Sequence, residues 1–345
     1  MRTVFLLISF LFLISLSFCQ PKNSLNDIII CDWYQDKKAA VSVTFDDNCE
    51  GQFTYALPIM NKRQIRSTFF VNTGSFGGCN ALNWQHVAEA LKTKHEIGSH
   101  TVNHFDLSKI SSDSIDYQLK TCKDTIDKHI GEGKCLTIAY PYGAGGTNTS
   151  KDESIRTIAA KYYIGARGAG IDKTGSVTYA AATSPYYTSF DYQIGSFAVG
   201  PEISQEAYIK VVDNAIAQNG WFIPQYHGIE TGGFANIPAK SFEEQMSYLE
   251  SKKEQLWIAP FVEVFKYQKE KRNATLFAEL TKNGLEITLT DRLTGEIYAQ
   301  PLTLKMPAYY KVTTAKQNGK DLQLIINKDY IYLSLVPNRG KVILK

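Results

Sequence analysis

Strand-like and helix-like segments alternate along the chain from residue 39 to residue 267. The strand-like runs are short and apolar, whereas the segments between them repeat apolar residues every three or four positions. The runs cover 39–45, 67–71, 96–98, 136–140, 162–166, 221–226 and 256–259. Helical patterns begin at Asn83, at Ser112 or Asp113, and at Ser150, and later ones contain 209–216, 242–249 and 262–267. Repeated strand and helix predict an α/β fold with a parallel sheet, most simply a (β/α) barrel.

The pattern changes after residue 272, where the helical periodicity fades. Apolar or alternating runs at 285–289, 297–306, 322–326, 330–336 and 342–344 are separated by turn sequences. We therefore expect a first domain over 20–272 and a small antiparallel β domain over 273–345 that stabilises it. Tyrosines 309, 310, 330 and 332 are interpreted as packing residues rather than a binding platform.

The N-terminus has the layout of a secretory signal peptide. Arg2 precedes an apolar run, and Ser17-Phe18-Cys19 offers small residues at −3 and −1 for cleavage before Gln20. We expect a signal peptide over 1–19 and a secreted protein, extracellular or periplasmic. A lipid anchor on Cys19 is disfavoured because Phe18 is bulky where such signals have a small residue. No later run is long and uncharged enough to cross a bilayer.

The charge of the chain after removal of the signal is close to balanced. Loss of Arg2 reduces the 37 basic residues to 36, against 34 acidic ones, a net charge of +2. So small a surplus argues against nucleic acid as a partner.

Five of the six cysteines remain once Cys19 is removed, so at least one thiol stays free. Cys122 and Cys135 flank one predicted helix end and are the pair that we expect to form a disulfide. Cys49, two residues past Asp47, is interpreted as a buried or bridged thiol rather than a nucleophile.

Two adjacent carboxylates, Asp46 and Asp47, end the first apolar run abruptly. Aspartates suit turns and helix starts, so capping is one interpretation. A second element favours chemistry, because His100 and His104 share a face if their segment is helical. One carboxylate with two imidazoles is a ligand set for Zn²⁺ or Fe²⁺ that leaves positions open for water.

Two further polar elements follow later strand candidates. Pro141-Tyr142-Gly143 follows the run 136–140, and His227 follows the run 221–226. Since functional groups of parallel α/β sheets gather at the C-terminal ends of strands, all four elements should converge on one rim. A histidine after an apolar strand is often a hydrogen-bonded core residue, but the strand-end position of His227 favours function.

These elements resemble the motifs of the polysaccharide deacetylase family, carbohydrate esterase family 4, also called the NodB homology domain. The motifs are Thr44-Phe45-Asp46-Asp47, the pair His100 and His104, Pro141-Tyr142-Gly143, and a last histidine at His227, within about residues 38 to 272. The resemblance implies a distorted barrel of about seven strands.

The resemblance also implies roles for individual residues. Asp47, His100 and His104 would hold a divalent metal, most simply Zn²⁺, with Co²⁺ or Fe²⁺ as alternatives. Asp46 would be the base and His227 the acid. The backbone N–H of Tyr142 would stabilise the oxyanion, while its ring and Pro141 would line the substrate site.

The chain departs from the family pattern at three places. Ala139 stands where the third motif usually has an arginine that orients the base, and Arg167 is our candidate substitute, although it could equally be a surface or ion-paired residue. An aspartate that tunes the catalytic histidine is not evident, and Asp172 and Asp191 are the candidates. Gln225 stands where a leucine commonly lines the acetyl-methyl pocket, a role that we assign to Ile223.

The resemblance implies a hydrolase that removes N-acetyl groups from N-acetylglucosamine units of a chitin-like or peptidoglycan-like polymer. Its partner would be the acetylated polysaccharide. One alternative is deacetylation of acetylated xylan. A more distant one is an iron oxygenase, which would leave Asp46 without a role. A decayed glycan-binding protein is the non-enzyme alternative, supported by the departures but opposed by the presence of Asp46, both metal histidines and His227.

Overall fold

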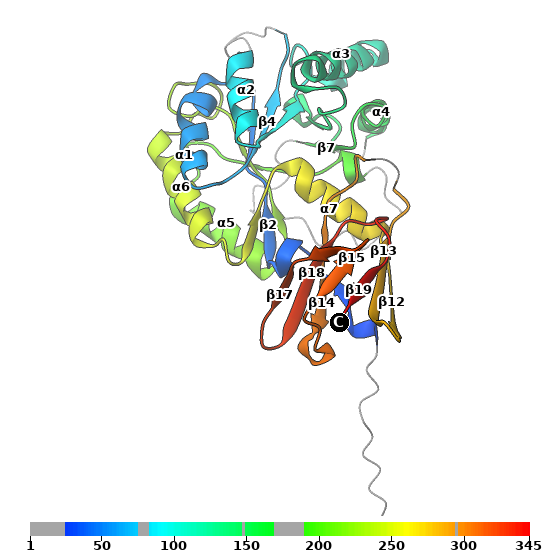
Figure 1. The fold of residues 1–345 in the computed structure, drawn as a ribbon. Helices are drawn as coiled ribbons and strands as arrows, with labels where there is room; N and C mark the ends of the chain where they lie inside the picture. The colour runs from blue at the N-terminus through cyan, green and yellow to red at the C-terminus, as the bar shows by residue number, and fades with distance from the viewer. Residues whose placement is uncertain (1–24, 75–82, 147–148, 169–189, 294–295) are drawn as a thin grey trace, which may run out of the picture.

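The structure is a computed structural model, and it describes residues 25–74, 83–146, 149–168, 190–293 and 296–345 (Figure 1). The expected signal peptide over 1–19, Cys19, Cys79 and the candidate Asp172 lie outside the described residues. None of the helices in the described ranges combines the length and apolar character that crossing a bilayer requires.

Seven parallel strands form a curled sheet in the order β7-β6-β5-β4-β3-β10-β8. They are β3 (Thr44–Asp46), β4 (Thr68–Val71), β5 (Glu96–Ser99), β6 (Thr137–Ala139), β7 (Gly165–Arg167), β8 (Phe197–Ala198) and β10 (Pro224–Tyr226). Ile194, just before β8, forms a parallel bridge with Arg167, so the same short segment reaches both edges of the sheet. The predicted distorted barrel is confirmed.

Two predicted strands are each divided in two. The run 39–45 forms β2 (Ala39–Val41) and then β3, and the run 221–226 forms β9 (Trp221–Phe222) and then β10. β2 pairs with β9 and with β11 (Leu256–Ile258) in a separate parallel sheet. The apolar pattern continues through both breaks, so the sequence did not reveal them.

Seven α-helices connect the strands of the described ranges. They are α1 (Leu57–Lys62), α2 (Trp84–Lys92), α3 (Ser112–Ile130), α4 (Ser150–Ala159), α5 (Gln205–Ala217), α6 (Ala239–Ser251) and α7 (Phe261–Asn273). The Asn83 side chain caps α2 by accepting from the Gln85 N–H, as predicted. α3 and α4 begin at Ser112 and Ser150, and their N-cap residues are Ser111 and Thr149.

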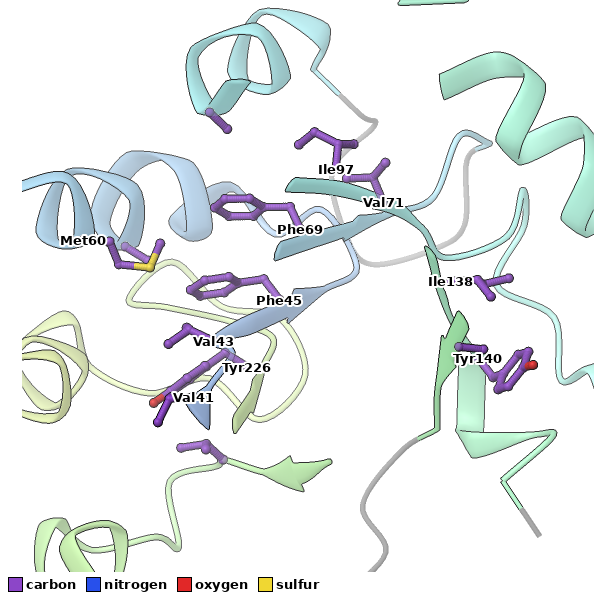
Figure 2. Packing of buried hydrophobic residues seen from close by; sticks show 14 of the residues in the cluster. Val41, Val43, Phe45, Met60, Phe69, Val71, Ile97, Ile138, Tyr140 and Tyr226 are labelled. Carbon is purple, nitrogen blue, oxygen red and sulfur yellow. The ribbon is translucent and has the colours of Figure 1, made fainter. Parts of the chain in front are cut away.

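Phe45 illustrates how the barrel strands are fixed. It is fully buried, and its ring lies 4.9 Å from Phe69, 5.5 Å from Tyr226 and 5.8 Å from Phe242 of α6. Figure 2 shows Phe45 and Phe69 on adjacent strands pointing to the side where Met60 lies. Because side chains alternate along a strand, burying Phe45 on this face directs Asp46 to the opposite face.

The C-terminal part is antiparallel β structure, as predicted, and it forms two sheets. One has the order β1-β14-β18-β17 and the other β12-β13-β19-β15-β16. Their strands are β1 (Ile29–Ile30), β12 (Thr275–Thr281), β13 (Gly284–Thr290), β14 (Leu302–Pro307), β15 (Ala315–Gln317), β16 (Lys320–Leu322), β17 (Leu324–Ile326), β18 (Tyr330–Leu335) and β19 (Val342–Leu344). β1 pairs with β14, so part of the N-terminal segment that we placed with the first domain joins the C-terminal sheet.

The two parts share a hydrophobic core. Trp221, Trp257 and Phe261 pack in one cluster with residues of the β sheets such as Ile287 and Leu304. α7 lies between the barrel and the β sheets (Figure 1). The Tyr267 hydroxyl of α7 also donates to the Cys31 carbonyl at 3.0 Å. The β sheets therefore support the base of the barrel rather than forming a separate module.

The expected Cys122–Cys135 disulfide is wrong, because both residues are free thiols. Cys122 lies on the buried face of α3, where its Sγ donates to the Val71 carbonyl, and Cys135 is buried ahead of β6. Burial raises the pKa of both thiols. Cys31 and Cys49 are also buried, and Cys49 is a thiol, as one of its two interpretations has it.

Glu270 of α7 generates a prediction about the stability of this shared core. Its side chain is fully buried, and one carboxylate oxygen accepts from the Gln300 N–H at 2.7 Å while the other has no partner among the described residues. Burial raises its pKa to about 7, Asp291 adds to this, and the Gln300 N–H and Lys266 oppose it. A raised acid pKa contributes stability below about pH 4.5, and this contribution is lost as the pH rises through about 7.

The wild type should lose about 3 kcal/mol of unfolding free energy through this group between pH 4.5 and pH 8. Glu270→Gln does not titrate there, so its stability should rise relative to that of the wild type by the same amount. Urea denaturation at several pH values measures this difference. Glu254→Gln, at a side chain that is 86% exposed, is the control and should follow the wild type. If the unfolding free energies of Glu270→Gln and the wild type change with pH in parallel, Glu270 does not have the raised pKa.

Candidate active site

The polar residues singled out in the sequence lie at one end of the barrel strands. Asp46 is the last residue of β3, Arg167 the last of β7, and Ala139 the last of β6. His100 directly follows β5, and His227 directly follows β10. Since these strands are parallel and adjacent, their C-terminal ends form one rim.

Asp47, His100 and His104 form a group in which one ligand atom from each residue lies within 4.8 Å of the others. Asp47 Oδ1 is 3.4 Å from His100 Nε2 and 3.2 Å from His104 Nε2. The helical spacing that we assumed for the two histidines is wrong. The segment is a loop in which Thr101 and His104 have positive φ angles of 68° and 54°, and this turn brings the second imidazole back beside the first.

The group fits a divalent metal. Asp47 Oδ1 is buried and has no hydrogen-bond partner among the described residues, as expected for an oxygen reserved for another ligand. His100 Nδ1 lies 2.7 Å from the Ala139 carbonyl, so its N–H donates there, which leaves Nε2, 3.4 Å from Asp47 Oδ1, as the atom available to a metal. A carboxylate with two imidazoles is a donor set typical of Zn²⁺ or Fe²⁺.

Charge keeps the Asp47 ligand oxygens ionised. Burial raises the pKa of its carboxyl group, but His100 and His104 outweigh this effect and hold the pKa well below its usual range. Asp47 itself has a φ of 76°, which is rare for a residue other than glycine. Strained backbone at Asp47 and His104 is typical of positions that the surrounding structure fixes for function.

Arg167 is completely buried, and its Nη2 donates to both carboxylate oxygens of Asp46. In the β6–β7 ladder, Arg167 is the register partner of Ala139. The arginine therefore stands one strand away from its family position but at the same level of the barrel. Arg167 is therefore not a surface residue. It forms a buried ion pair with Asp46 and so contacts the candidate base directly.

Gln225 and Ser196 complete the surroundings of Asp46. Gln225 Nε2 donates to Asp46 Oδ2 at 2.8 Å, and Ser196 Oγ donates to Gln225 Oε1 at 2.8 Å. Arg167 Nη1 also donates to Ser196 Oγ at 3.1 Å. Burial raises the pKa of Asp46, but Arg167 and then His100 outweigh burial, so the pKa lies below its usual value.

His227 lies beside both aspartates. Its Nε2 is 4.0 Å from Asp46 Oδ2 and 3.9 Å from Asp47 Oδ2, while its Nδ1 has no partner among the described residues. Burial lowers its pKa, against the effect of the two carboxylates. Asp191 does not tune this histidine, because its carboxylate pairs instead with Lys269 and Arg272 of α7.

The structure places Ile223 and Gln225 in different surroundings. Ile223 is buried in the core shared with the β sheets, among residues such as Trp221. Gln225 at the leucine position directs its amide to Asp46 instead of offering an apolar surface. Gln225 therefore contributes to the surroundings of Asp46, and the role of Ile223 in an acetyl-methyl pocket stays a prediction.

Pro141 and Tyr142 lie in a short 3₁₀ turn after β6 (η5, Pro141–Gly143). Pro141 is buried, whereas Tyr142 is 70% exposed with a φ of 56°. The Tyr142 ring contacts the imidazole of His104, with 4.8 Å between ring centroids. The third motif thus lies beside the metal group.

Buried amides that the sequence analysis missed hold these loops together. Gln52 Nε2 donates to the carbonyls of Asp46 and His227, which ties the end of β3 to the end of β10. Asn72 Nδ2 donates to the His100 carbonyl, and Asn48 bonds to the Asn72 backbone at 2.9 and 3.0 Å. The one signal in the sequence was polar residues directly after apolar strands, as at Asn72.

Residues 34–162 match the family model described as polysaccharide deacetylase. The resemblance stated from the motifs is therefore confirmed. The match ends before β7, so it does not include Arg167, Gln225 or His227.

Individual curated proteins and solved structures are also similar to parts of this chain. A gellan lyase from a Bacillus species is 25% identical over 92% of this chain and 13% of its own length. A chitin deacetylase from Arthroderma benhamiae is 33% identical over 32% of this chain and 30% of its own. The solved chitin deacetylase of Colletotrichum lindemuthianum has a TM-score of 0.45 at 16% identity, covering 68% of this chain and 89% of that one. The chain thus spans less than a third of either curated relative.

The ligand group predicts one zinc site. We expect isothermal titration to give one Zn²⁺ per chain, and Asp47→Asn to weaken binding by at least about 100-fold, because it removes the anionic ligand. His129→Gln, at an exposed histidine of α3, is the matched control and should bind as the wild type does. Unchanged affinity in Asp47→Asn would place the metal elsewhere.

The buried ion pair predicts a large effect on stability. Arg167→Met should cost about 3 kcal/mol or more, because it leaves the Asp46 carboxylate buried without its cation. The same substitution should cost clearly less in an Asp46→Asn background, and denaturant unfolding of the four proteins gives this coupling. Lys120→Met breaks an exposed pair with Asp124 and should cost less than about 0.5 kcal/mol. Equal costs of Arg167→Met in both backgrounds would mean that the pair contributes no coupling.

Proposed function

We propose that this chain is a metal-dependent hydrolase that removes N-acetyl groups from N-acetylglucosamine units of a polysaccharide. The observation that supports this most is the position of Asp46. It lies next to the metal-ligand group, with Oδ2 3.9 Å from His100 Nε2, and Arg167 and Gln225 bind and orient its carboxylate. A second, separately oriented carboxylate is what hydrolysis needs and a simple metal site does not.

Asp47, His100 and His104 would hold the metal. When bound there, a divalent ion lowers the pKa of a water molecule and polarises the acetyl carbonyl. Asp46 takes a proton from the attacking water, and the ion pair with Arg167 keeps its carboxylate ionised and in place for this role. The buried surroundings strengthen these charge interactions.

His227 supplies the second proton transfer. Its Nε2 lies at about the same distance from both aspartates, so it faces the space where the tetrahedral carbon would form. Donating a proton from this imidazole to the departing amine nitrogen completes amide cleavage. The Tyr142 N–H would add a hydrogen bond to the oxyanion.

The substrate class rests on the relatives. The chitin deacetylase matched by this chain acts, by its name, on a polymer of N-acetylglucosamine. We extend this to a chitin-like or peptidoglycan-like polymer for this chain. The signal-like N-terminus further supports a secreted enzyme that meets such polymers outside the cytoplasm.

Acetate release tests the proposal. Zinc-loaded protein should release acetate from N-acetylglucosamine oligomers, chelation should abolish the release, and Asp46→Asn should lower kcat by at least about 100-fold because the base is lost. Acetylated xylan is the comparison substrate. Release from xylan alone would favour the esterase alternative, and binding of oligomers without release from any substrate would favour a decayed glycan-binding protein.

A further inference from the structure

Phe234 is a large apolar side chain left exposed beside the site. It is 70% exposed, as Tyr142 is, whereas the other aromatic residues near Asp46, such as Phe45 and Phe70, are buried. A side chain this exposed contributes little to the core. An exposed aromatic residue next to catalytic groups is typical of ligand binding.

The two exposed rings cover different histidines of the site. Phe234 contacts His227 edge to face, with 4.9 Å between centroids and an interplanar angle of 85°. Tyr142 contacts His104 in the same manner, at 4.8 Å and 63°. His104 lies against Asp47 Oδ1 and His227 against Asp47 Oδ2, so the rings flank the aspartate at its two oxygens.

The loop that carries Phe234 is held firmly. The Gly228 N–H donates to the Phe234 carbonyl at 3.0 Å, and Ile229 and Ile237 form a bridge across the base of the loop. Gly233 has a φ of 103°, and a Cβ there would lie 2.7 Å from the Cys49 sulfur, so the loop packs directly on the segment after Asp47. The ring is therefore exposed on a fixed backbone, which favours recognition over loose surface packing.

We propose that Phe234 is a substrate-binding residue and that its ring, opposite Tyr142, forms a subsite for the pyranose ring that carries the reacting acetamide. This inference rests on the proposed function. An acetamide that reaches the space between Asp46 and the histidines must have its sugar just outside them, where the exposed rings of Phe234 and Tyr142 lie against His227 and His104. N-acetylglucosamine has equatorial substituents, so its axial C–H groups form apolar faces that pack on aromatic rings.

The test compares two substrates, an N-acetylglucosamine oligomer and a small aryl acetate that has no sugar. In zinc-loaded Phe234→Ala, kcat/KM for the oligomer should fall about tenfold more than kcat/KM for the aryl acetate, mainly through a higher KM. Phe234→Tyr keeps the ring and should restore the wild-type ratio. Phe277→Ala, at a phenylalanine of β12 that is 57% exposed, is the matched control and should leave both values unchanged.

Equal losses on both substrates would overturn the inference, because they would mean that Phe234 acts through His227 rather than on the sugar. An unchanged oligomer KM in Phe234→Ala would overturn it as well. If the wild type hydrolyses neither substrate, calorimetric binding of the same oligomer separates the two proposals. Oligomer binding that Phe234→Ala weakens about tenfold would keep the subsite while the proposed hydrolysis fails. If the wild type does not bind the oligomer, both the proposed hydrolysis and the Phe234 subsite are contradicted.

Discussion

The buried ion pair between Arg167 and Asp46 is the interaction on which the site depends. Burying a carboxylate without a cation would cost several kcal/mol and would favour its protonated form. Arg167 prevents this from the end of β7, across the barrel from the Asp46 position on β3. The pair also requires the barrel to close, because Ser196, just before β8, bonds to Arg167 and Gln225. The contacts that close the barrel thus also orient the Asp46 carboxylate.

The C-terminal β sheets pack against the end of the barrel opposite the polar groups. Trp257 and Phe261 share a core with the C-terminal sheets, and β1 at the start of the described chain pairs with β14. The antiparallel sheets therefore fix the base of the barrel while the opposite ends of the strands carry the polar groups.

The sequence alone predicted the elements that follow local rules. Alternating apolar patterns predicted the parallel sheet, and polar residues after those patterns identified Asp46, His100 and His227 as neighbours on one rim. Arg167 became a candidate only because Ala139 stands where the family has the arginine that orients the base. That the two are register partners could not be read from the sequence, because register depends on pairing across the sheet.

Other errors have similar physical causes. The loop at His104 was taken as helical because positive φ angles at Thr101 and His104 leave no clear trace in a sequence without glycine there. Cys122 and Cys135 looked like a pair by their positions in the chain, but each is buried as a free thiol. Gln52, Ser196 and Phe234 lie in segments with no motif, and only their contacts in three dimensions show what they touch.

The central claim is that Asp47, His100 and His104 bind the metal beside a separate base. X-ray absorption spectroscopy of the zinc-loaded protein tests it most directly, because it reports the ligand atoms themselves. The account predicts only nitrogen and oxygen ligands at about 2.0–2.1 Å, with an imidazole signal from two histidines that Asp47→Asn perturbs. A sulfur shell at about 2.3 Å would assign the zinc to cysteines and contradict the account.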